Sequence, residues 1–272
     1  MSDGAIKEED PPELFFPGDK QLCTEELFFF LRDFKKLMDF FFFIINLATA
    51  ADQVRSRASK VLAETAKDDD EREMYLKKSG EVVFDKLKNF GTLNSRNLTT
   101  NTVDTFLWFF SSIIKACINK NPVLLKSSES ITVEEVLDFD RKTDLIDYLI
   151  DRKINSLSYG GIRQMEGFLS DRLGVNAFKN DDSRDLLGIF VEVRNIYIHN
   201  RGVVNRLFLS RVKRHFDFEF VEDKRFHVNF DEFSILANNS VKVAVDIDER
   251  LAKKFRLRRF RYGTWLKKKN LN

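Results

Sequence analysis

The stretch Ile189–Asn205, IFVEVRNIYIHNRGVVN, has the apolar spacing of a buried helix but carries polar side chains in its middle. On a helix, where successive residues turn by about 100°, Val191 and Ile198 form a narrow apolar stripe. On nearly the opposite side lies a broader apolar face, which predicts the contact with the core. That face consists of Ile189, Phe190, Val193, Ile196 and Tyr197.

Polar residues flank the narrow stripe on both sides. Glu192, Asn195 and His199 follow one edge, and Arg194 and Arg201 follow the other. A helix with two apolar stripes needs two partners. The second partner is either another helix of the same chain or the same helix of a second copy, packed about a twofold axis.

Phosphodiester chemistry fits these polar residues. The imidazole of His199 can take or give a proton near neutral pH. The guanidinium of Arg194 can hold a phosphate and stabilise the negative charge that develops on it. Glu192 or Asn195 can fix the tautomer of the imidazole. Together these groups suffice for attack by a ribose 2′-hydroxyl on its own phosphate without a metal ion.

The segment Arg194–His199 resembles the signature of HEPN domains (higher eukaryotes and prokaryotes nucleotide-binding). That signature is an arginine, then a polar residue, then a histidine, with four to six residues between arginine and histidine. His199–Asn205 and the helical layout from Ile131 onward also resemble bacterial HEPN-like proteins of the RiboL-PSP-HEPN and abortive-infection type. The resemblance covers Ile131–Leu209, and the preceding Phe-rich helices more loosely.

The resemblance implies a helical bundle that dimerises through the motif helix. In active members it implies a metal-independent endoribonuclease, often in toxin–antitoxin, abortive-infection or other antiviral defence systems. Arg194 and His199 are then catalytic and Asn195 supports them, whereas Glu192 rests on the helical wheel alone. The alternative is a non-catalytic HEPN-like module for dimerisation or protein interaction, in which Arg194 and His199 are structural.

The pattern along the chain predicts an all-α fold, a HEPN-like bundle with a small C-terminal α/β or irregular extension. Thr132 and Glu135 have the spacing of a capping box. From Phe216 the sequence FDFEFVEDKRFHVNFDEFSIL alternates apolar and polar residues, which predicts strands. We therefore expect a disordered acidic tail over residues 1–20, the bundle over 21–215 and an extension with a basic tail over 216–272.

Composition limits the other sites. Two cysteines and three histidines in 272 residues, without a CxxC motif, predict neither a disulfide framework nor a zinc site, and no cofactor is expected. Net charge is only +2, but no acidic residue follows Glu249. That basic end either binds an anionic partner or docks its aromatic residues on the domain. Three arginines near the motif are candidate RNA-binding residues: Arg201, Arg206 and Arg211.

The N-terminus lacks the basic start and apolar run of a signal peptide. The most apolar stretch, Leu37–Ala51, is shorter than the roughly 18 residues of a spanning helix, and Asp39 and Asn46 interrupt it. We expect it to be a buried core helix, and we expect a cytoplasmic homodimer without a membrane. The expected partners are an RNA substrate and an antitoxin or defence complex.

Overall fold

The structure is a computed structural model that describes residues 13–16, 18–77, 80, 82–125, 131–159 and 161–269. Most of the expected acidic tail, residues 1–12 and 17, lies outside this described part. The fold is 74% helical with one small two-stranded sheet in the described residues, so the expected all-α class is confirmed.

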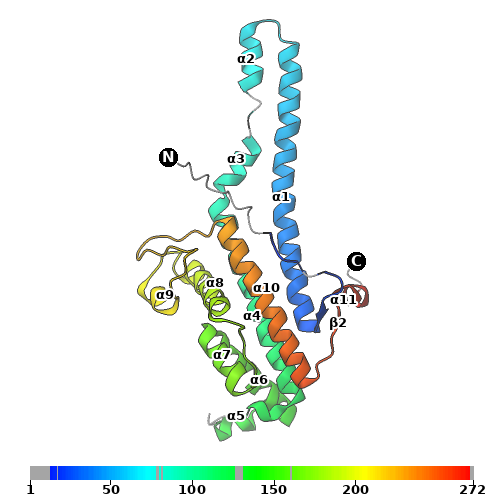
Figure 1. The fold of residues 1–272 in the computed structure, drawn as a ribbon, viewed down its shortest axis with the longest axis vertical. Coiled ribbons are helices and arrows are strands. Elements are labelled where there is room, and N and C mark those ends of the chain that lie inside the picture. The colour runs from blue at the N-terminus through cyan, green and yellow to red at the C-terminus, as the bar shows by residue number, and fades with distance from the viewer. Residues whose placement is uncertain are drawn as a thin grey trace, which may run out of the picture.

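Four long helices build the core: α1 (Glu25–Glu64), α4 (Gly91–Lys120), α8 (Asp181–His199) and α10 (Phe230–Phe255). Helix α4 packs against the other three (Figure 1). Phenylalanine rings join the helices, and each buried ring contributes roughly 2–3 kcal/mol of hydrophobic stabilisation. The ring centroids of Phe30 (α1) and Phe106 (α4) are 6.0 Å apart, and those of Phe190 (α8) and Phe233 (α10) are 6.2 Å apart.

Shorter elements surround this core. Helices α6 and α7 pack on α4 and α8, respectively, and the capping box predicted at Thr132 and Glu135 begins α5. The short elements are β1 (Leu22–Cys23), α2 (Asp69–Lys77), α3 (Val82–Asn89), η1 (Pro122–Leu125), α5 (Val133–Leu137), α6 (Lys142–Tyr159), α7 (Gly161–Asp171), α9 (Arg206–Arg211), β2 (Phe260–Arg261) and α11 (Tyr262–Lys268).

The distal half of α1 projects from the bundle as an arm, with α2 folded back along it (Figure 1). Asp52 of α1 fixes the next helix to the arm, because its carboxylate accepts hydrogen bonds from the backbone N–H groups of Val83 (3.0 Å) and Phe84 (2.8 Å). These bonds satisfy N–H groups of the first turn of α3, which have no partner within the helix. They also lower the pKa of Asp52.

The expectation that Leu37–Ala51 is a buried core helix is wrong for most of the stretch. It is helical, but Phe40 is 62% exposed and Phe43 is 61% exposed, whereas Met38 and Ala48 are buried. The reason is that α1 extends beyond the end of the bundle. Among the described residues, only α2 and α3 pack against it in the arm. By length and composition α1 could cross a membrane, and only 17% of its most apolar 18-residue window is buried. One such helix near the N-terminus is also compatible with a soluble protein.

The strands predicted between Phe216 and Leu236 are also absent from the described structure. Residues 212–229 form turns with isolated bridges, and Phe230–Leu236 begins α10. A capping box of Asn229 and Glu232 starts this helix. The change of pattern at Phe216 does not mark the edge of the core, because Phe233 and Leu236 are buried in it.

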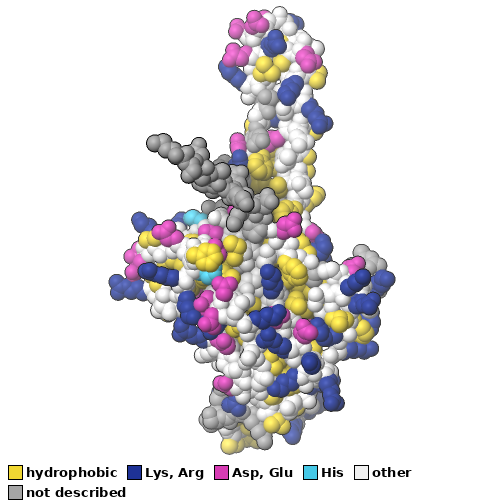
Figure 2. All heavy atoms as spheres, viewed as in Figure 1, with side chains coloured by type: hydrophobic (Ala, Val, Ile, Leu, Met, Phe, Trp, Pro, Cys, Tyr) yellow, Lys and Arg dark blue, Asp and Glu magenta, His cyan; other side chains and the backbone are white. Residues whose placement is uncertain are grey.

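The basic C-terminal end folds back on the start of α1. Strand β2 pairs antiparallel with β1, and the indole N–H of Trp265 donates to the carbonyl of Cys23 (3.0 Å). Tyr262 and Trp265 are buried, so these aromatic residues dock on the domain. Lysine and arginine side chains gather on the surface around α11 (Figure 2).

Asp248 of α10 lies fully buried beneath this junction. Its carboxylate accepts from the backbone N–H of Thr24 (3.2 Å) and from the Thr24 hydroxyl, and lies 3.2 Å from Nε of Arg259. Burial raises the pKa of Asp248 to about 6, and the hydrogen bonds of Thr24 and the charge of Arg259 oppose that rise. The carboxylate thereby ties the beginning and the end of the chain to α10.

Candidate functional site

Helix α8 carries the motif, and both of its ends are fixed locally. Asn180 caps the N-terminus by accepting from the backbone N–H of Ser183 (2.9 Å). At the C-terminus Gly202 has φ +82° and its N–H donates to the carbonyl of Ile196 (2.9 Å). Glycine adopts this left-handed conformation without the steric cost of a side chain. Gly202 therefore helps to end the helix.

The broad apolar face of α8 faces the core as predicted. All five of its residues, from Ile189 to Tyr197, are buried. The narrow stripe divides in two: Val191 is buried within the chain, whereas Ile198 is 47% exposed. The second stripe is therefore covered at its N-terminal end by this chain and open at its C-terminal end.

A pocket of about 510 Å³ lies beside that open end, between α8 and α9. We call it the α8 pocket. It brings together the motif residues, one arginine of α9 and a residue of α4. Its lining consists of Leu107, Glu192, Arg194, Asn195, Ile196, Ile198, His199, Asn200, Asn205, Leu207, Phe208 and Arg211.

Asp104 of α4 holds the guanidinium of Arg194. Its Oδ1 lies 2.6 Å from Nη2 and 2.8 Å from Nε of Arg194. Nη1 of Arg194 donates to the side-chain oxygen of Asn195 at 3.3 Å. Planar guanidinium groups are well suited to such fixed, multiple hydrogen bonds. Arg194 is thus oriented from two sides, by Asp104 and by Asn195.

Glu192 is engaged by Arg211 rather than by the histidine. Nη1 of Arg211 lies 3.3 Å and 3.4 Å from the two carboxylate oxygens of the buried Glu192. The described contacts therefore give Glu192 a role in placing Arg211 and α9. Glu192 and Asn195 were the residues expected to fix the tautomer of His199. Among the described contacts, neither forms a hydrogen bond with the imidazole ring of His199.

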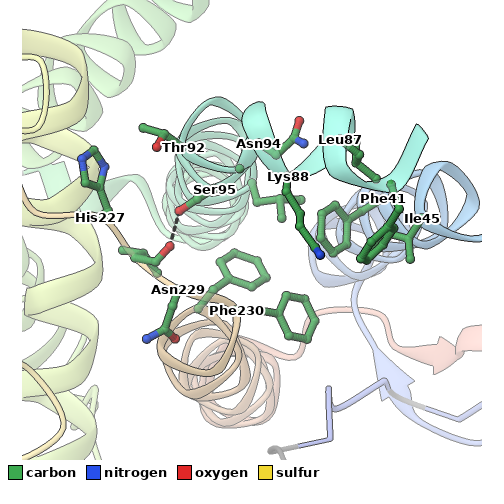
Figure 3. Close-up of a pocket in the computed structure, with 15 residues that line it drawn as sticks. Phe41, Ile45, Leu87, Lys88, Thr92, Asn94, Ser95, His227, Asn229 and Phe230 are labelled. Carbon is green, nitrogen blue, oxygen red and sulfur yellow. Dashed lines mark hydrogen bonds between the residues drawn. The ribbon is translucent and has the colours of Figure 1, made fainter. Parts of the chain in front are cut away.

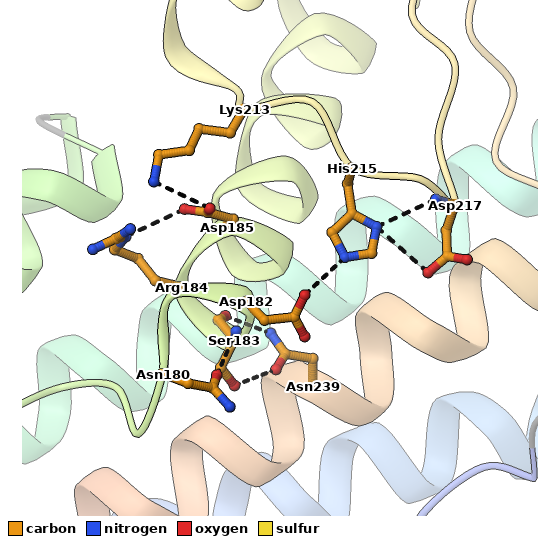
Figure 4. Close-up of polar contacts among 9 residues, drawn as sticks. All are labelled: Asn180, Asp182, Ser183, Arg184, Asp185, Lys213, His215, Asp217 and Asn239. Carbon is orange, nitrogen blue, oxygen red and sulfur yellow. Dashed lines mark hydrogen bonds and ion pairs between the residues drawn. The ribbon is translucent and has the colours of Figure 1, made fainter.

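His199 is exposed at the last turn of α8, and within the described residues no hydrogen bond or ion pair engages its ring. His215 differs sharply (Figure 4). Nε2 of His215 lies 3.0 Å from Oδ1 of Asp182, and Nδ1 accepts from the backbone N–H of Asp217 at 3.3 Å. His215 therefore fixes the chain after α9 onto the first turn of α8. His199 keeps both ring nitrogens available to a ligand.

More ion pairs support the same junction. Oδ1 of Asp185 lies 3.2 Å from Nε of Arg184, and Oδ2 lies 3.2 Å from Nζ of Lys213 (Figure 4). Ser183 donates to the side-chain oxygen of Asn239 of α10 at 2.6 Å. The N-terminal half of α8 is thus fixed to its neighbours, and the α8 pocket forms at the other half.

No model of a protein family matches this chain. Comparisons with characterised proteins and with solved structures give no match either. The interpretation of the α8 pocket therefore rests on its residues and their geometry.

Two of the candidate RNA-binding arginines lie outside the α8 pocket. Arg201 follows α8 with φ +51°, and the highly exposed Arg206 pairs with Glu222 at 2.8 Å. Arg211 does line the pocket. No sequence pattern indicates Asp104, which lies 90 residues from Arg194. It also did not single out Asn205, whose side chain caps α9 by accepting from Phe208.

A second pocket, of about 370 Å³, lies where α1, α3, α4 and the start of α10 meet. Its walls are mainly apolar, including Phe41, Ile45 and Phe230 (Figure 3). The hydroxyl of Ser95 donates to the carbonyl of Val228 there, and His227 lies apart from the aromatic rings. This pocket lacks the convergent charges of the α8 pocket.

No group of three or more histidine, cysteine, aspartate or glutamate residues that could hold a metal ion occurs in the described residues. The charged groups at the α8 pocket are those of Arg194, Arg211 and Glu192, with Asp104 behind Arg194. Chemically, the pocket offers cationic groups for a phosphate and one unengaged imidazole for proton transfer.

Proposed function

We propose that the chain is a metal-independent endoribonuclease of HEPN type that cleaves RNA at the α8 pocket. One observation carries this proposal: the unengaged ring of His199 lines the same pocket as the guanidinium of Arg194, which Asp104 and Asn195 orient. A proton-transfer group beside a fixed cation is what 2′-hydroxyl attack on a phosphate needs.

In the proposed reaction the ribose 2′-oxygen forms a bond to phosphorus while the bond from phosphorus to the 5′-oxygen breaks. His199 takes the proton of the 2′-hydroxyl, and Arg194 stabilises the charge on the non-bridging phosphate oxygens. The departing 5′-oxygen is protonated by a second acid, for which the His199 of a second copy is the candidate. The products are a 2′,3′-cyclic phosphate and a 5′-hydroxyl. Arg211, Arg201 and Arg206 contact the flanking RNA backbone.

The proposed assembly is a homodimer about α8. Ile198 (47% exposed) and Leu207 (57% exposed) give the α8 pocket an apolar rim. Packing this rim against its counterpart would bring both His199 side chains into one cleft. We place the enzyme in the cytoplasm, under the control of an antitoxin or a defence complex.

A second candidate function is a non-catalytic module for dimerisation or protein interaction. The ion pairs Arg194–Asp104 and Arg211–Glu192 favour it, because structural pairs explain both arginines without a substrate. On this alternative the wild type has no nuclease activity, and Arg194→Ala weakens an assembly.

The two candidates are separated by comparing one oligonucleotide as RNA and as its all-2′-deoxy form, both in the presence of EDTA. The nuclease proposal expects cleavage of the RNA alone, because the deoxy form lacks the nucleophile. Cleavage of the deoxy form, either in EDTA or in a parallel reaction in which magnesium replaces EDTA, would overturn the proposed mechanism. Failure to cleave any RNA would favour the non-catalytic module.

A further inference from the structure

One side of α1 carries exposed apolar side chains along the arm. Each is between 59% and 67% exposed. We call this set the arm stripe, and it consists of Phe40, Phe43, Leu47, Val54 and Val61. Phe40, Leu47, Val54 and Val61 follow one another at intervals of seven residues. An apolar repeat of seven residues is the pattern of a helix that packs lengthwise along another helix.

Along the arm, α1 is covered by other helices only on the side away from the arm stripe. Its buried residues there are Ala48, Asp52, Ser59 and Ala63, on the side of α2 and α3. At about 100° per residue, the arm stripe lies roughly opposite these buried residues. Hydrophobic side chains are visible along the arm in the space-filling view (Figure 2). The arm stripe has no partner among the described residues.

We propose that the arm stripe packs against α1 of a second copy of this chain, with the two helices antiparallel. From Phe40 to Val61 the stripe is about 32 Å long at the usual helical rise. Its exposed apolar surface is on the order of 500 Å² per chain, in the range of the largest apolar patch on a typical soluble monomer, and such patches often mark interaction sites. Two such stripes together bury on the order of 1,000 Å², which is the lower limit of a specific interface.

Size and charge select the antiparallel arrangement. With a twofold axis near Ala50, residues that face each other have numbers that sum to about 100. The large Phe40 then faces the smaller Val61, and Leu47 faces Val54. At the flank, Asp39, which pairs with Lys35 of its own helix at 2.7 Å, would face the exposed Lys60 of the other copy. A parallel pair would instead place Phe40 beside Phe40 and would put the two Asp39 side chains on opposite flanks, away from Lys60.

This interface is separate from the α8 pocket and does not depend on the proposed function. A contact through the arm and a contact through α8 have different twofold axes. If both form, the assembly is larger than a dimer. Variants on the arm test the arm alone, because they leave every residue of the α8 pocket unchanged.

The first test measures molar mass by light scattering during size-exclusion chromatography. We expect the full-length chain to have at least twice the mass of its Leu47→Glu/Val54→Glu variant. Val133→Glu is the matched control, because Val133 is 75% exposed on α5, and it should keep the wild-type mass. Circular dichroism confirms that the variants are folded.

Equal masses for the wild type and the double variant would overturn the proposal. Sedimentation with phosphatidylcholine vesicles, done in parallel, then shows whether the arm stripe binds lipid instead. Capture of the wild type but not of the double variant would assign the stripe to a membrane surface and also contradict pairing of copies.

The second test examines the register. Asp39→Lys and Lys60→Asp should each weaken association by about two- to five-fold, the range of exposed ion pairs. The double variant Asp39→Lys/Lys60→Asp should restore it, because the reversed charges face each other again. A double variant weaker than either single variant would rule out the antiparallel register.

Discussion

The carboxylate of Asp104 lies against the guanidinium of Arg194, with Oδ1 2.6 Å from Nη2 and 2.8 Å from Nε. This contact joins α4 to the motif helix and fixes the cation of the α8 pocket. The pair is partly exposed, since the two side chains are 23% (Arg194) and 48% (Asp104) exposed. Its effect on stability is therefore small, and its effect on the position of Arg194 is the more important one.

Asp104→Asn should reduce RNA cleavage while changing the free energy of unfolding by less than about 1 kcal/mol, as for other partly exposed ion pairs. The loss should appear in kcat, because a mobile guanidinium stabilises the transition state less well. Single-turnover kinetics and urea denaturation measure the two effects.

The matched control for this prediction is Asp151→Asn, which breaks the exposed ion pair with Lys115 between α4 and α6. It should leave cleavage unchanged. An equal loss of activity in both variants would mean that Asp104 does not act through Arg194.

Gly202→Ala should destabilise the protein by about 1–3 kcal/mol, the usual cost of a strained left-handed residue. Gly202 has φ +82°, and an added Cβ would lie 3.2 Å from the ring of Tyr197. Gly188→Ala, within α8, meets nothing within 4 Å and should stabilise by about 0.5–1 kcal/mol. Thermal denaturation of the two variants should therefore shift in opposite directions, and shifts of the same sign would contradict the described end of α8.

Asp248 should make stability depend on pH between about 4 and about 6. Burial raises its pKa from 3.8 to about 6, so the folded state binds the proton more tightly than the unfolded chain. Its contribution to the free energy of unfolding is therefore largest below the unfolded pKa. That contribution falls as the pH rises to about 6 and is constant above it.

Comparing the wild type with Asp248→Asn isolates this contribution. The free energy of unfolding of the wild type minus that of the variant should be larger at pH 4, where Asp248 is protonated in the folded state, than at pH 7, where it is buried as a charged carboxylate. Asp246→Asn, on the same helix, is the control without a buried carboxylate. A difference for Asp248→Asn that is the same at both pH values would show that its pKa is not raised.

The sequence predicts the fold class and the buried face of α8 because both depend on a local helical period. The capping box of Thr132 follows from local chemistry in the same way. The strand prediction after Phe216 was wrong because alternation over a few residues cannot outweigh the tertiary contacts that hold Phe233 and Leu236 in a helix. The exposure of the arm was not predicted because apolar residues alone do not show whether a helix extends beyond the helices that it packs against.

The site was predicted only in part for a similar reason. Arg194, Asn195 and His199 are close in sequence and on one helix, so their spacing indicates a common site. Asp104 reaches Arg194 from another helix, and Arg211 reaches Glu192 from α9. Such contacts depend on how helices pack, which a single sequence does not specify.

The central claim is that His199 transfers a proton during RNA cleavage. The most direct test incubates a mixed RNA pool in EDTA with the wild type, His199→Ala and the control His227→Ala, which changes an exposed histidine outside the α8 pocket. We predict 2′,3′-cyclic phosphate and 5′-hydroxyl ends with the wild type and the control, and no cleavage with His199→Ala. Equal cleavage by all three proteins, or cleavage by none, would contradict the claim.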